Sequence, residues 1–264
     1  MGTQEFSIES STVGSGAQKV AFLHGLMGRG KNFTRIARGL GDDYQVLLMD
    51  MPNHGASDWT DSFDYADMAD LVARDLENGF AADGPVDVIG HSMGGKIAML
   101  LALRHPHLVN KLVIMDIAPN DSKGSFTVLL DSLLSLDLAT LKSRSAASDE
   151  IADRVPDAGV RGFLLQNLAR GKDGFYWEPN LPMLRKNLDA IMGWEPVDAQ
   201  PFENPVLWVA GANSNYIQPE DTPVMRQLFP RVRKISVKGA GHWVHADKPE
   251  EVTYILNSFL QQES

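Results

Sequence analysis

The chain has 264 residues, of which 44% are hydrophobic and 22% charged, with a net charge of −10 and no cysteine. Such a composition suits a globular protein with one large core; it excludes disulfides and thiolate metal sites, and it argues against a nucleic-acid partner, which needs clustered Lys and Arg. The N-terminus lacks a signal-peptide pattern and no apolar stretch approaches the length of a membrane span, so we expect a cytoplasmic protein with no membrane partner.

Short apolar runs alternate with helical patterns along most of the chain. This alternation is typical of an α/β fold with a mostly parallel central sheet and helices on both faces, because continuous apolar runs suit strands that are buried on both sides. The predicted strands are Phe6–Ser10 at an edge, Lys19–Leu23, Gln45–Met49, Val86–Ile89, Lys111–Met115, Pro205–Val209 and Val232–Val237. The predicted helices are Asn32–Leu40, Tyr65–Phe80, Gly94–Arg104, Thr222–Phe229 and Pro249–Gln261.

The stretch between Asp121 and Asp198 breaks this alternation, because it holds leucine-rich helical patterns and no convincing strand. These helical patterns are Phe126–Leu138, Ile151–Val155, Gly162–Ala169 and Leu181–Met192. Long insertions in compact domains often form functional lids. We therefore expect residues 1–120 and 199–264 to form the core and residues 121–198 a helical cap. An independent small domain or an oligomerisation surface is the alternative.

The most informative segment is Gly90–Gly95, which reads Gly-His-Ser-Met-Gly-Gly between a predicted strand and a predicted helix. A serine in Gly-x-Ser-x-Gly at such a turn is the nucleophile elbow of serine hydrolases. The turn is so sharp that positions two before and two after the serine need residues without a bulky Cβ, and the serine itself is strained. Ser92 is therefore the predicted nucleophile; the alternative is a Gly-rich helix entry with an incidental serine.

Ser92 needs a base, because a free hydroxyl is a weak nucleophile at neutral pH. Among the seven histidines, His242 follows the last predicted strand in a glycine-rich loop before the final helix. This place matches the chain order Ser, acid, His that one large class of serine hydrolases uses, so His242 is the predicted base. We expect His54 to be structural, His245 to cap or pack near the final helix, and the side chain of His91 to point away from the turn.

The third residue must orient His242 and stabilise its charged form. No acid stands in Gly211–Ser214, after the strand where one is usually found. Asp116 follows the strand after the elbow helix, at the edge of a parallel sheet where ligands gather. Asp221 and its neighbour Glu220 lie beside prolines at a predicted helix start, a position suited to capping. We therefore predict Asp116 as the acid, with a loop cap as its alternative role.

An oxyanion hole needs two backbone N–H groups aimed at the developing charge. One is expected from Met93, after the nucleophile, and the other from Leu26, in the loop after the first long strand. The segment Gly25–Asn32 also nearly matches a phosphate-binding Gly-x4-Gly-Lys-[Ser/Thr] loop, with Asp50 as the corresponding magnesium ligand. This alternative fails at Asn32, where a hydroxyl should stand, and it leaves the elbow unexplained.

With these motifs the chain resembles α/β-hydrolases, and more narrowly the YbfF-type esterases of bacteria, which are related to the mitochondrial abhydrolase-domain-eleven proteins. The resemblance runs from about Val20 to Leu260. The segments that carry it are His24–Leu26, Asp50–Ser57, Gly90–Lys96, Asp116–Pro119, Gly211–Ser214 and Gly239–Ala246. In that family the acid follows the strand after the elbow helix, which agrees with Asp116. The resemblance implies an α/β-hydrolase fold and activity on short-to-medium acyl esters and acyl-CoA thioesters.

The expected reaction is hydrolysis of a small-molecule acyl ester or thioester through an acyl-enzyme on Ser92, without metal or cofactor. We expect Trp177, Trp194 and Trp243 to bind the substrate, and core packing is the alternative for each. Two other functions would fit the same residues: a carbon–carbon bond hydrolase or lyase, and a non-catalytic ligand-binding protein with this fold. The sequence leaves the oligomeric state open.

Overall fold

The computed structural model describes residues 6–122, 126–195 and 197–262, and within them seven strands form one mixed sheet. The strand order is β1-β3-β2-β4-β5-β8-β9, and every neighbouring pair is parallel except β1 with β3. The strands are β1 Ser10–Val13, β2 Gln18–Leu23, β3 Tyr44–Met49, β4 Val86–His91, β5 Val109–Met115, β8 Val206–Gly211 and β9 Val232–Val237. This sheet confirms the predicted α/β fold class.

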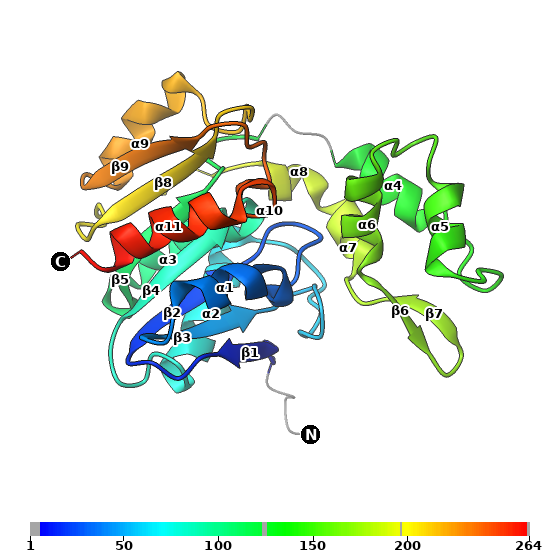
Figure 1. Ribbon diagram of the computed structural model, residues 1–264, viewed down its shortest axis with the longest axis horizontal. Helices are drawn as coiled ribbons and strands as arrows, with labels where there is room; N and C mark the ends of the chain where they lie inside the picture. The colour runs from blue at the N-terminus through cyan, green and yellow to red at the C-terminus, as the bar shows by residue number, and fades with distance from the viewer. Residues whose placement is uncertain (1–5, 123–125, 196, 263–264) are drawn as a thin grey trace.

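Helices cover both faces of the sheet, and the core strands are buried on both sides as their continuous apolar sequences predict. In β2, Val20 and Phe22 belong to the apolar cluster of α1 and α11, whereas Ala21 and Leu23 belong to that of α2 and α3. Figure 1 shows α1 and α11 in front of the sheet. The helices outside the insertion described below are α1 Thr34–Leu40, α2 Tyr65–Asn78, α3 Met93–Arg104, α9 Thr222–Leu228, α10 Val244–Asp247 and α11 Pro249–Leu260, with short 3-10 helices at Gly30–Phe33, Pro106–Leu108 and Pro219–Asp221.

The chain between β5 and β8, here called the insertion, extends to one side of the sheet (Figure 1). It contains α4 Thr127–Leu134, α5 Arg144–Glu150, α6 Ala158–Leu165, α7 Leu181–Lys186, α8 Leu188–Met192 and the hairpin of β6 Leu168–Gly171 with β7 Gly174–Trp177. The buried Lys96 of α3 holds the C-terminal part of the insertion at the end of α8. Its Nζ group donates to the carbonyls of Met192 and Gly193 at 2.8 and 2.7 Å. Burial lowers the pKa of Lys96 to about 8.

Three elements differ from the sequence-based expectations. The insertion does contain strands: the β6–β7 hairpin turns at Lys172 and Asp173, and Gly174 adopts the left-handed region with φ 123°. The segment Ile151–Val155 is a turn, while a helix forms before it, where the Ser143 hydroxyl caps Arg144–Glu150. The edge strand is the polar Ser10–Val13 and not Phe6–Ser10, because Ser10–Val13 pairs with β3 whereas the N–H groups of Ser7 and Glu9 donate to side chains of the loop after β3.

No helix in the described parts of the chain combines the length and the apolar character that crossing a membrane requires.

Candidate active site

Ser92 lies at the turn between β4 and α3 in a strained backbone conformation, with φ 53° and ψ −121°. Residues other than glycine rarely adopt a positive φ, and such backbone strain is concentrated at functional sites. The flanking glycines are required by close backbone contacts. A Cβ on Gly94 would lie 2.3 Å from the Leu23 carbonyl oxygen, and one on Gly90 would lie 2.4 Å from that of Gly94. The local sequence therefore gives the turn that presents Ser92.

The structure brings Ser92, His242 and Asp116 into one hydrogen-bonded line. His242 Nε2 lies 2.9 Å from Ser92 Oγ, and His242 Nδ1 lies 2.8 Å from Asp116 Oδ2. In a neutral imidazole with this arrangement, Nδ1–H donates to the carboxylate and Nε2 accepts from the hydroxyl. Asp221 lies elsewhere: its carboxylate accepts from the Asn120 amide at 2.5 Å and from the Gln218 N–H at 2.7 Å.

Asp116 is fully buried, and donors surround its carboxylate. Its Oδ1 accepts from the Gly211 N–H at 2.8 Å, and its Oδ2 accepts from the Ser214 hydroxyl as well as from His242. A buried carboxylate is tolerated only when hydrogen bonds replace its hydration. The position after β8, where the sequence lacks an acid, therefore supplies Ser214 as a donor to an acid that comes from β5.

Two neighbouring rings hold His242 in place, and of these the sequence did not single out Tyr216. The Tyr216 ring stacks on it with centroids 3.8 Å apart and planes at 17°, and burial raises the pKa of the Tyr216 phenol. The side chain of His91 points away from Ser92, as expected, and its Nε2 donates to the His242 carbonyl at 2.8 Å. Burial holds the pKa of His91 well below its ordinary value, so it serves as a neutral donor. Tyr216 lies in an irregular loop, where no periodic signal marks it.

The backbone N–H groups of Leu26 and Met93 flank Ser92, and among the described residues neither has a hydrogen-bond acceptor. The Gly25 carbonyl accepts from His24 Nδ1 at 2.8 Å and from the Gly28 N–H at 2.9 Å. Because the Gly25 C=O and the Leu26 N–H belong to one planar peptide and point in opposite directions, these two bonds orient the Leu26 N–H. A Cβ on Gly25 would lie 2.9 Å from Ser92 Cβ, so this loop needs glycine there.

Two buried histidines cross-brace this loop with the loop after β3. His24 Nε2 accepts from the Met51 N–H at 2.9 Å, and His54 Nε2 accepts from the Met27 N–H at 3.1 Å. Their Nδ1 atoms face carbonyl oxygens, so each carries its proton on Nδ1. Burial lowers the pKa of His24 to about 4 and that of His54 to about 3. Both imidazoles are therefore neutral structural groups at pH 7, which is the role expected for His54.

The phosphate-loop alternative does not fit the geometry. In a phosphate-binding loop the backbone N–H groups point at the ligand. Here the Arg29 N–H donates to the Asn32 side chain at 2.7 Å and the Gly30 N–H donates to the Asp50 carboxylate at 2.8 Å. These two N–H groups and Asp50, the expected magnesium ligand, are thus hydrogen-bonded to other groups of the protein. Among the residues that the structure describes, no group of three or more His, Asp or Glu side chains could hold a metal ion.

The cavity at Ser92 is small: its volume of about 10 Å³ is the space of roughly one water molecule. Phe126 and Phe163 of the insertion line it together with Trp243. A larger groove of about 450 Å³ lies beside it and shares Phe163 and Trp243 in its walls. Of the tryptophans expected to bind substrate, Trp243 thus lines both spaces, Trp194 lines a separate pocket, and Trp177 packs against the core.

Comparison with known proteins assigns the family. A family model described as the alpha/beta hydrolase fold matches residues 20–249. The chain belongs to the α/β-hydrolase family. This hydrolase is 36% identical over 251 residues to the sn-1-specific diacylglycerol lipase ABHD11 of Mus musculus, which covers 91% of this chain and 80% of that relative. It is 32% identical over 247 residues to Esterase YbfF of Escherichia coli (strain K12), covering 91% of this chain and 92% of the relative.

A solved structure of similar sequence gives the same result. The structure titled Marine microorganism esterase superposes with a TM-score of 0.92 at 31% identity, covering 97% of this hydrolase and all of the other chain. The resemblance to YbfF-type esterases and the prediction of a hydrolase are thereby confirmed.

Proposed function

We propose that this hydrolase is a serine esterase that cleaves short-to-medium acyl esters through an acyl-enzyme on Ser92. The observation that carries the proposal is the line of hydrogen bonds from Ser92 Oγ through His242 to Asp116, beside two N–H groups that have no acceptor among the described residues. The names of its relatives, an esterase and a diacylglycerol lipase, support acyl esters as the substrate class. Acyl-CoA thioesters belong to the proposed range, because a thioester reacts by the same steps.

The proposed mechanism has two halves. His242 Nε2 takes the proton as Ser92 Oγ attacks the acyl carbonyl, and Asp116 holds the imidazole in the required tautomer and stabilises its positive charge. The N–H groups of Leu26 and Met93 stabilise the oxyanion. His242 then gives the proton to the leaving alkoxide or thiolate. In the second half His242 deprotonates a water, which attacks the acyl-enzyme, and the proton returns to Ser92 Oγ as the carboxylic acid leaves.

The insertion is proposed to act as the cap of this site. The small cavity at Ser92 has room for about one water molecule, whereas even a butyrate ester needs several times that volume. Substrate entry therefore requires Phe163 of the insertion and Trp243 to move apart; their ring centroids are 5.7 Å apart. The neighbouring groove, which these two rings border, is the proposed route to Ser92.

Hydrolysis of p-nitrophenyl acetate and butyrate tests the proposal, together with covalent labelling by a fluorophosphonate. We expect Ser92→Ala to lose labelling and to lose turnover by a factor on the order of a million. Wild-type protein without turnover would favour a ligand-binding protein or a carbon–carbon bond hydrolase, and an active Ser92→Ala variant would refute the assigned nucleophile. A series of acyl chain lengths, presented as p-nitrophenyl esters and as CoA thioesters, identifies the preferred substrate.

A further inference from the structure

Met27, directly after the proposed oxyanion donor Leu26, is fully buried and held at both its backbone polar groups. Its backbone lies in the left-handed region with φ 61°, a conformation that residues other than glycine rarely take. Its N–H donates to His54 of the core at 3.1 Å, and its C=O accepts from Asn167 Nδ2 at 2.8 Å. A strained residue persists only where its surroundings impose the conformation. One of the two groups that do so here belongs to the insertion.

Asn167 lies between α6 and β6 of the insertion, and its side chain is fully buried. Its Nδ2 donates to the Leu164 carbonyl at 3.1 Å as well as to Met27. Because both partners are acceptors, the orientation of the amide is determined. Its Oδ1 is then buried with no partner in the described chain, which is unfavourable. The polar contacts of this buried amide are therefore the two bonds that its N–H groups donate.

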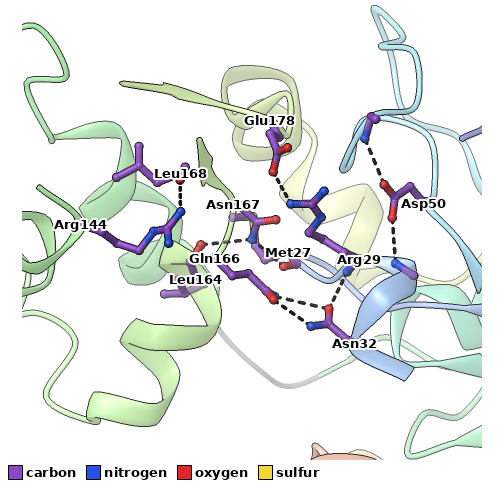
Figure 2. Close-up of polar contacts among 12 residues, drawn as sticks. Met27, Arg29, Asn32, Asp50, Arg144, Leu164, Gln166, Asn167, Leu168 and Glu178 are labelled. Atoms are coloured by element: carbon purple, nitrogen blue, oxygen red, sulfur yellow. Dashed lines mark hydrogen bonds and ion pairs between the residues drawn. The ribbon is translucent and has the colours of Figure 1, made fainter. Parts of the chain in front are cut away.

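Two more contacts join the same loop to the same part of the insertion (Figure 2). The Arg29 guanidinium forms an ion pair with Glu178, and the Asn32 amide donates to Gln166 Oε1 at 2.8 Å. In the figure Asn167 points toward Met27 from the insertion side, next to these pairs. The insertion thus contacts the loop at three successive points, of which only Asn167 bonds directly to the backbone near Leu26.

The bond from Asn167 reaches the Leu26 N–H through two planar peptides. The Met27 C=O lies in the same peptide plane as the Gly28 N–H, so the Asn167 bond orients that N–H. The Gly28 N–H donates to the Gly25 C=O at 2.9 Å. The Gly25 C=O in turn shares its peptide plane with the Leu26 N–H. A rotation of the Met27–Gly28 peptide therefore weakens the bond that aims the Leu26 N–H at the oxyanion.

We propose that Asn167 is a positioning residue of the oxyanion hole, through which the seated insertion holds the Leu26 N–H in place for acyl transfer. This inference rests on the proposed esterase function. It makes the insertion part of the site's scaffold, in addition to a cover over it. Displacement of the insertion would release the Met27 carbonyl, and the hole would lose the alignment of one of its two donors.

The test compares Asn167→Ala with a matched control, Gln166→Ala, which removes a neighbouring contact between insertion and loop without touching Met27. We expect Asn167→Ala to lower kcat for p-nitrophenyl butyrate by roughly 10- to 100-fold. A misplaced oxyanion donor stabilises the transition state less, and the largest possible loss is that caused by removing the donor altogether. KM should change by less than about threefold. Gln166→Ala should keep kcat within about threefold. Melting temperatures establish that each variant is folded.

Inhibition separates a positioning role from a structural one. Butylboronic acid forms a tetrahedral adduct whose oxygen occupies the oxyanion hole, whereas butyrate binds without that geometry. In Asn167→Ala the inhibition constant of the boronic acid should rise by the same factor by which kcat falls, and the inhibition constant of butyrate should stay unchanged. If Asn167→Ala does not fold, Asn167→Ser, which keeps a donor, replaces it with a smaller loss of kcat in the same direction.

The inference is overturned if a folded Asn167 variant keeps wild-type kcat, or if Gln166→Ala loses as much. An equal weakening of boronic acid and butyrate also overturns it, because that pattern indicates general damage to the site. These outcomes leave the esterase proposal intact as long as wild-type protein hydrolyses the ester and Ser92→Ala does not. Inactive wild-type protein would instead contradict the proposed function itself.

Discussion

Acidification to pH 5 is predicted to destabilise this protein strongly through its buried histidines. His24, His54 and His245 are buried, and burial lowers their pKa values to about 4, 3 and 3. In the unfolded chain each titrates near 6.5. Because the folded pKa lies below the unfolded one, the unfolded state binds protons first as the pH falls. Stability is therefore complete above pH 6.5 and is lost progressively as the pH falls toward the folded pKa values.

The size of this loss follows from proton linkage. At pH 5, which lies about 1.5 units below the unfolded pKa, protonation of each histidine stabilises the unfolded state by about 2 kcal/mol relative to pH 7.5. The three histidines together lose about 6 kcal/mol, and His91, whose pKa burial also depresses, adds to the loss. A typical domain is stable by about 5–15 kcal/mol. We therefore expect a large part of the total stability to disappear between pH 6.5 and 5.

Urea denaturation at a series of pH values, followed by circular dichroism, measures this effect. The free energy of unfolding should fall by about 4 kcal/mol for each pH unit between pH 6 and about pH 4, since each of three protons contributes about 1.4 kcal/mol. His54→Asn should reduce that slope by one proton, whereas Ser92→Ala, which keeps every histidine, should retain it. A flat wild-type profile, or a His54→Asn slope equal to that of wild type, would refute the reasoning.

Three further predictions concern the proposed site. Asp116→Asn should lower kcat by roughly 10⁴-fold, because the imidazole loses its orienting carboxylate, while Asp221→Asn should cost less than about tenfold; the reverse order in steady-state kinetics would move the role of the acid. Gly94→Ala should destabilise the protein by at least about 1–3 kcal/mol in urea denaturation, because the new Cβ meets the Leu23 carbonyl oxygen, and an unchanged midpoint would contradict the close packing. Phe163→Ala should raise kcat/KM for octanoate relative to acetate esters by about tenfold, and a chain-length series with a uniform change would argue against a gate at this ring.

The core of the sheet could be predicted from the sequence because its strands are continuous apolar runs between helical patterns. Each predicted strand from Lys19–Leu23 onward overlaps a strand of the structure. The turn at Ser92 could equally be predicted, because its glycines stand where a Cβ would clash with the backbone. The choice of Asp116 over Asp221 depended on strand order and family resemblance, and the structure places Asp116 beside His242.

What the sequence could not predict depends on contacts between distant segments. Tyr216 stacks on His242 from a loop with no periodic pattern, and Phe163 reaches the Ser92 cavity from the insertion. The size of a tryptophan side chain does not tell which cavity it lines, and Trp194 lines a pocket away from Ser92. The β6–β7 hairpin is too short to produce a clear alternation of apolar and polar residues. Such features depend on tertiary packing, which local sequence patterns do not determine.

Ser92 and Asp116 both come from one strand–helix–strand unit, β4–α3–β5, whereas His242 comes from the far end of the chain. During translation the nucleophile and its carboxylate therefore leave the ribosome long before the histidine, with the whole insertion made in between. Under the proposed mechanism a nascent or truncated chain is catalytically silent until β9 pairs with β8 and brings the His242 loop to the sheet edge. Ester hydrolysis thus becomes a reporter of the docking of this C-terminal segment, and a polypeptide that stalls before it cannot attack cellular esters.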